Sequence, residues 1–114
     1  MNNLDIPILQ KTYELCKLFH QYSEKFPKKD RFTIGQRCEN HILILLESVI
    51  YASKSAKDNK ARLLFEISVK LDTLKILIRL LKEVKTIDLK QYAHLEECVF
   101  EIGKMLGGWI KFVH

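Results

Sequence analysis

The sequence predicts an all-α protein, folded as an antiparallel up-down-up-down four-helix bundle. Its 114 residues include only four glycines and two prolines, the residues that most often interrupt helices. Apolar residues recur every three or four positions over long stretches, and the alternation typical of strands is absent. Short polar connections make consecutive helices antiparallel neighbours. The chain length suits one domain, residues 1–114.

The first helix is expected over residues 6–25. Asp5 is a suitable N-cap, and Pro7 is tolerated in a first turn. Phe26-Pro27 ends the helix, because the residue before a proline avoids the α region. The apolar surface of this helix is expected to consist of the stripe Ile6, Leu9, Tyr13 and Cys16, extended by Phe19, Tyr22 and Phe26.

The second helix is expected over residues 34–55, after a turn whose Phe26 and Phe32 should fold inward. Thr33 and Gln36 have the spacing of a capping box. One face of this helix carries Ile34, Cys38, Ile42, Leu45, Val49 and Ala52.

The third helix, over residues 59–85, has two apolar stripes on roughly opposite sides. The inner stripe is Leu64, Ile67, Leu71, Leu74, Ile78 and Leu81, and the outer stripe is Phe65, Val69, Ile76 and Leu80. A bundle helix in a monomer needs an apolar arc of only a little over ~100°. The outer stripe therefore predicts an interface between copies of the chain. The alternative is a helix unusually buried within its own bundle.

The fourth helix is expected over residues 89–112, with Asp88 and Gln91 as a second capping pair. Its inward residues are Tyr92, Leu95, Val99, Ile102, Leu106 and Trp109. Gly103, Gly107 and Gly108 would let another helix approach closely near its end, or would let the end fray.

The net charge of +5 favours an anionic partner, nucleic acid above all. Lys75, Arg79 and Lys82 share one face of the third helix. In a ring of copies this row would form a cationic pore or rim that binds RNA or DNA through the backbone, without reading sequence. A second group of cations, near the first turn, consists of Lys28, Lys29, Arg31 and Arg37. The ordinary alternative for both groups is a solvated surface.

No catalytic motif is present: the chain lacks a Walker loop, G-x-S-x-G, H-E-x-x-H and the Glu-x-x-His pair of metal-binding bundles. We therefore expect no enzyme activity, no cofactor and no metal. Cys16, Cys38 and Cys98 lack a C-x-x-C spacing, which predicts buried reduced thiols. The longest apolar run is residues 42–46, and the N-terminus does not resemble a signal peptide. We expect a cytoplasmic protein with no membrane partner.

Two segments in combination resemble the Avd family, the accessory proteins of diversity-generating retroelements. The first is FPKKDRFTIGQR at residues 26–37, and the second is IGKMLGGW at residues 102–109. Residues 8–13 and 74–80 are similar to the family as well, so the likeness covers nearly the whole chain.

The resemblance implies a four-helix bundle that assembles as a barrel-like homopentamer with a basic surface. The implied role is non-enzymatic: binding of the reverse transcriptase and of template-repeat RNA and DNA, in support of mutagenic cDNA synthesis. Arg31, Arg37 and Arg79 are carried over as polar functional residues. Lys104, which stands where the family often has arginine, is carried over as a further nucleic-acid-binding residue. A runner-up resemblance is to the bundle proteins encoded in intervening sequences of bacterial 23S ribosomal RNA genes. A third interpretation is a purely structural oligomer.

Overall fold

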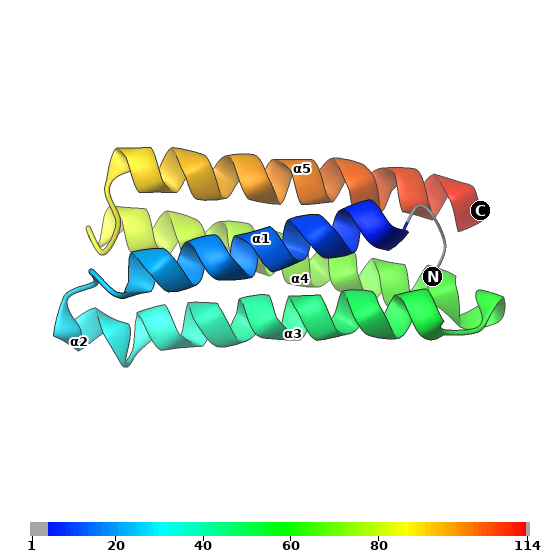
Figure 1. Cartoon of the computed structure of the whole chain (residues 1–114), viewed down its shortest axis with the longest axis horizontal. Helices are drawn as coiled ribbons and strands as arrows, with labels where there is room; N and C mark the ends of the chain where they lie inside the picture. Colours follow the sequence, from blue (N-terminus) through cyan, green and yellow to red (C-terminus); the bar gives the residue numbers. More distant parts are fainter. Residues whose placement is uncertain (1–4, 114) are drawn as a thin grey trace.

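The computed structural model describes the backbone of residues 5–113 and the side chains of residues 7–113. Within these residues all regular structure is helical: α1 (Asp5–Ser23), α2 (Lys28–Arg31), α3 (Ile34–Lys54), α4 (Lys57–Glu83) and α5 (Leu89–Val113). Figure 1 shows the four long helices side by side along the molecule's long axis, with their connections at alternate ends. The molecule extends 44 × 22 × 19 Å. The predicted bundle of four long helices is confirmed, and its helix ends lie within about two residues of the expected ones.

Each long helix packs against two others, α1 and α4 both lying against α3 and α5. The inner faces predicted for the second, third and fourth long helices are confirmed. All of their named residues are buried except Ile34 and Tyr92, which are half-buried. Trp109 is 1% exposed and is one of the largest side chains in the core. Removal of this apolar surface from water is the main force that holds the helices together.

The predicted apolar stripe of α1 is wrong by one position at Leu9, Tyr13 and Cys16, whereas Phe19 is buried as predicted. The residues buried in the core are Ile8, Thr12, Leu15 and Phe19. Tyr13 is 52% exposed, Leu9 and Cys16 are half-buried, and the side chains of Asp5 and Ile6 lie outside the described residues. Thr12 is the one polar residue of this buried face. Its hydroxyl, however, donates to the Ile8 carbonyl at 2.7 Å, which removes the cost of burying it.

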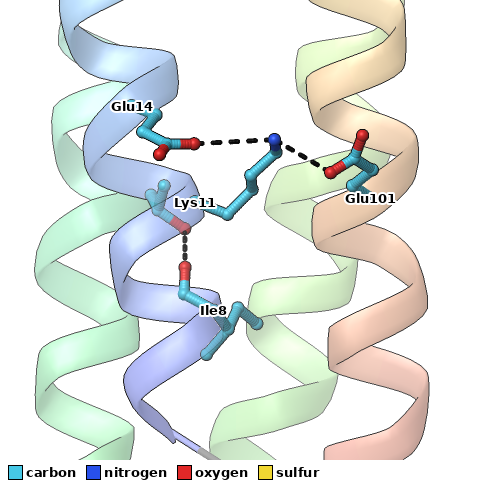
Figure 2. Close-up of polar contacts among 5 residues, drawn as sticks. Ile8, Lys11, Glu14 and Glu101 are labelled. Atoms are coloured by element: carbon cyan, nitrogen blue, oxygen red, sulfur yellow. Dashed lines mark hydrogen bonds and ion pairs between the residues drawn. The ribbon is translucent and has the colours of Figure 1, made fainter.

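Lys11, the next residue on α1, connects that helix to α5. Figure 2 shows its ammonium group between two carboxylates, that of Glu14 on the same helix at 3.5 Å and that of Glu101 on α5 at 2.8 Å. The hydrogen bond to Glu101 raises the pKa of Lys11. Tyr22 and His94 make a second α1–α5 link, with 2.8 Å between the Tyr22 hydroxyl and His94 Nδ1.

The two predicted capping boxes have opposite outcomes. The pair at the start of α5 is confirmed: the Asp88 N–H donates to Gln91 Oε1 at 3.0 Å, and the Gln91 N–H donates to Asp88 Oδ1 at 2.8 Å. The pair at the start of α3 is wrong, because Thr33 makes no side-chain cap bond to that helix. Its hydroxyl donates instead to the Lys29 carbonyl at 2.6 Å. The one-turn helix α2, which the sequence did not predict, offers that acceptor immediately before α3.

The start of α3 lies very close to α2, and this contact fixes the connection between α1 and α3. Gly35 is buried, and a Cβ atom there would lie 2.8 Å from both the Asp30 carbonyl oxygen and the Phe26 ring. Phe26 is buried as predicted, edge-on to Phe19 with 5.6 Å between ring centroids. The same prediction is wrong for Phe32, which is 61% exposed. The α2 turn closes before this residue, so its side chain points away from the core.

The glycines of α5 make no tight helix contact within the protomer. A Cβ atom at Gly107 or Gly108 would meet no atom within 4 Å, and one at Gly103 would be in ordinary contact with Leu71. The helix continues to Val113, so the alternative of a frayed end is wrong.

Candidate nucleic-acid interface and assembly surface

One end of the bundle brings together residues 24–38 and 79–90, which we name the basic end. Figure 1 shows α2 at the same end of the molecule as the connection between α4 and α5. The Thr86 hydroxyl, from that connection, donates to Asp30 Oδ2 of α2 at 3.0 Å. Thr86 is only 7% exposed and Asp30 is half-buried, so this bond is partly shielded from water and connects the two segments.

The charge of the protein is unevenly distributed between this end and the rest. The basic end contains nine Lys and Arg residues against four Asp and Glu residues, whereas the remainder of the chain contains ten of each. The whole net charge of +5 therefore belongs to the basic end. Such an asymmetry produces a positive potential at one pole of the molecule and attracts polyanions to it.

Neighbouring groups contact two of these cations, Arg79 and Lys82, without fully burying them. Arg79 donates through Nε to Glu83 at 2.9 Å, and this contact raises the pKa of Arg79. The Lys82 ammonium lies 4.3 Å from the centroid of the Tyr92 ring. Exposed pairs of this kind contribute little to stability, so the cations can exchange these partners for phosphates.

Six of the eight predicted nucleic-acid-binding residues lie at the basic end: Lys28, Lys29, Arg31, Arg37, Arg79 and Lys82. Lys75 lies eight residues before the end of α4, roughly 12 Å away along the axis, and pairs with Asp72 at 3.6 Å. Lys104 lies fifteen residues into α5, roughly 22 Å from its start. Lys75 nevertheless lies one helical turn, roughly 6 Å, from Arg79, so it continues the cationic row along α4, whereas Lys104 lies apart from the other predicted residues.

Sequence reasoning missed three further cations of the basic end, Lys25, Lys85 and Lys90. They belong to no helical stripe, so periodicity could not group them. They could have been found from their positions near helix ends. All three lie within about two residues of a helix boundary, at connections that an up-down bundle places at the same end.

The outer stripe of α4 is exposed in the protomer. Phe65 and Ile76 are each 68% exposed, Val69 is 49% exposed and Leu80 is 39% exposed. The alternative, that this stripe is buried within its own bundle, is therefore wrong. The stripe lies along the side of the molecule, opposite the α4 residues that face the core. Further exposed apolar residues on α3 are Leu43, Ile44, Ile50 and Tyr51.

The rest of the described chain offers no cluster suited to metal chemistry. Residues 5–113 contain no group of three or more His, Cys, Asp and Glu that could hold an ion. All three cysteines are free thiols; Cys38 is buried, whereas Cys16 and Cys98 are half-buried. Burial raises the pKa of Cys38 to about 12, so its thiol stays protonated and unreactive. None of the helices in these residues has the length and hydropathy needed to cross a bilayer.

The fold and this charge distribution define a small helical-bundle protein with one strongly basic end and an exposed apolar side. A family model described as bAvd-like matches residues 6–113, nearly the full length of the chain. The protein therefore belongs to the bAvd-like family, whose Avd-type members are accessory proteins rather than enzymes. A search of curated proteins found no match.

Proposed function

We propose that this protein, as a single domain of residues 1–114, is the cytoplasmic accessory subunit of a diversity-generating retroelement. It binds the element's reverse transcriptase together with template-repeat RNA and DNA, and so supports mutagenic cDNA synthesis. Membership of the bAvd-like family supports the accessory role. The single observation that carries nucleic-acid binding is the concentration of the whole net charge at the basic end.

Binding is electrostatic and independent of base sequence, because lysine and arginine contact phosphates through charge. Each neutralised phosphate releases condensed counterions, so affinity falls steeply with salt. If about six phosphates are engaged, raising salt from ~50 to ~200 mM lowers affinity by about 10³-fold.

The protomers, each an up-down-up-down bundle, assemble into a homopentameric barrel. The outer stripe of α4, Phe65, Val69, Ile76 and Leu80, supplies one side of the contact. A ring contact joins two different surfaces, so a second apolar surface is needed. The exposed apolar residues of α3 fit that requirement. Changing Ile76 and Leu80 to Gln should leave the fold intact and reduce the particle size in light scattering. An unchanged size would exclude the stripe as an interface.

The decisive binding experiment compares charge reversal at the two ends of the bundle. Lys28→Glu, Lys29→Glu and Lys85→Glu alter the basic end. The control variant changes Lys54, Lys57 and Lys111 to Glu. These three lysines are exposed and lie near helix ends at the opposite end of the bundle. Both triple variants undergo the same change in net charge.

The basic-end variant should lose about 10²-fold or more in RNA affinity at low salt and show a shallower salt dependence. The control should lose much less, and both should melt near the wild-type temperature. Equal losses would mean that only overall charge matters. A flat salt response in the wild type would contradict the mechanism itself.

Reverse-transcriptase binding is tested separately, by inspecting the neighbouring genes and by co-purification with any reverse transcriptase that they encode. A neighbouring polymerase gene with paired variable and template repeats supports the proposal. Placement of the gene inside a ribosomal RNA operon would instead favour the intervening-sequence bundle proteins.

A further inference from the structure

Phe32 is the one exposed aromatic residue among residues 24–38 and 79–90, the basic end. It is 61% exposed, whereas Phe26, the other aromatic residue there, is buried. The ring lies among cations, so this surface offers an apolar face beside positive charge, and a partner with an apolar face and a negative charge would match both.

The backbone at Phe32 is held in place before any partner arrives. It caps the C-terminal end of α2, where the N–H of the next residue, Thr33, donates to the Asp30 carbonyl at 3.2 Å. The Arg31 guanidinium lies 6.0 Å from the centroid of the Phe32 ring and donates to the Glu24 carbonyl. Because the backbone is already ordered here, a ligand that stacks on the ring has only the side chain left to order.

A groove of about 400 Å³ adjoins the ring, between the end of α1, α2 and the first turns of α3. Its lining residues include Gln36 and Asn40, one helical turn apart, whose amides carry both hydrogen-bond donors and acceptors. Glu24 and Glu39 also line it, and Glu39 pairs with His20 at 2.8 Å. These carboxylates repel phosphate, so the groove suits a neutral heterocycle, while the phosphates remain on the lysines of α2.

We propose that Phe32 is a stacking platform for one unpaired nucleobase of the strand bound at the basic end. This inference rests on the nucleic-acid binding proposed above and adds a preference for single strands. A base inside a duplex is already stacked on both faces and cannot reach the ring. Stacking on an aromatic side chain tolerates any base, because every base has a π-face.

The test uses the full-length protein and three variants: Phe32→Ala, Phe32→Trp and the control Phe112→Ala. Phe112 is 63% exposed and lies near the C-terminal end of α5, away from the basic end, so its loss matches that of Phe32 in chemistry but not in place. Affinities for a single-stranded RNA and for a duplex of equal length are measured by fluorescence anisotropy over a range of salt concentrations.

Phe32→Ala should weaken single-strand binding roughly 5- to 100-fold, with an unchanged salt dependence and an unchanged duplex affinity. Phe32→Trp should retain single-strand affinity, and its indole fluorescence should be quenched on binding; Trp109 is buried and gives a constant background. Phe112→Ala should match the wild type.

Other outcomes would overturn the inference in distinguishable ways. Salt-dependent binding that is indifferent to Phe32→Ala, or weakened equally for single strands and duplexes, rejects the stacking platform and leaves the proposed function intact. A change in particle size for Phe32→Ala identifies the ring as a contact between copies and also rejects the platform. A wild type that binds neither form of nucleic acid rejects the proposed function and this inference with it.

Discussion

Gly35→Ala tests whether the close approach of α2 to α3 holds the basic end together. The new Cβ atom would lie 2.8 Å from the Asp30 carbonyl oxygen and 2.8 Å from the Phe26 ring, where ordinary contacts begin at 3.4 Å. Neither neighbour can move freely. The Asp30 carbonyl accepts the Thr33 N–H at 3.2 Å, and the Phe26 ring packs edge-on against Phe19.

Two effects of opposite sign set the size of the change. Overpacking of this kind costs about 1–3 kcal/mol. Alanine gains at most about 1 kcal/mol over glycine in a helix interior, and less in a first turn. Because Gly35 is the second residue of α3, overpacking dominates. We expect a net loss of about 1–2 kcal/mol and a fall in melting temperature of about 4 °C or more.

Urea and thermal unfolding followed by circular dichroism measure this loss. The control is Gly107→Ala, the same substitution at an exposed helical position where a Cβ atom would meet nothing within 4 Å. At that position only the higher helix propensity of alanine acts, so the stability of the control should rise by about 0.5–1 kcal/mol. A Gly35→Ala protein as stable as the wild type would refute the close-approach argument. A destabilised Gly107→Ala protein would show that another chain approaches α5 at that point.

Three further predictions concern single residues. Lys85 has a φ of 67°, a conformation that favours glycine at the end of a helix, so Lys85→Gly should raise stability by about 0.5–1 kcal/mol. Lys85→Ala, which removes the same charge but keeps a Cβ atom, should not, and equal melting temperatures for the two variants would exclude backbone strain. The hydrogen bond to Glu39 raises the pKa of His20, so the contact stabilises the fold below about pH 6.5 and is lost as pH rises through the folded-state pKa. Glu39→Gln should lower the His20 midpoint in an NMR titration and reduce stability at pH 6 but not at pH 9, whereas an unmoved midpoint would contradict the pairing. Cys38 should react with a thiol reagent only at the rate of unfolding, and rapid labelling of the native protein would contradict its burial.

Helical periodicity predicted the core where a face was uniformly apolar, as in α3, α4 and α5. It failed in α1 because the core of that helix contains Thr12, whose polarity is hidden by a hydrogen bond to its own helix. Such a bond depends on the backbone geometry, which the residue type alone does not reveal. The pattern of Thr and Ser bonding four residues back was the one available hint.

The capping pairs show how neighbouring structure overrides a local signal. At the start of α5, the preceding connection leaves the backbone N–H groups of Asp88 and Gln91 available. Each donates to the side chain of the other residue, as predicted. Thr33 and Gln36 have suitable residue types and spacing. However, α2 ends just before them, and its Lys29 carbonyl accepts the hydrogen bond of the Thr33 hydroxyl. Because α2 was not predicted, neither the Thr33 bond to Lys29 nor the exposure of Phe32 could be predicted. The exposure of Phe32 depends on where that short helix ends.

The cations were visible in the sequence, but their convergence required the topology. Lys28 and Lys85 are far apart in the chain, and the Thr86–Asp30 bond brings their segments together.

The position of the basic end determines where the cations would lie in the proposed ring. A closed ring of five identical subunits has cyclic symmetry, in which every copy points the same way along the axis. Contacts through the outer stripe use the side of the bundle, so five basic ends, each with its own Phe32, would gather on one rim rather than line a pore. A long RNA held by one end is then at high effective concentration for the next, which makes tight binding a property of the assembly rather than of a single protomer.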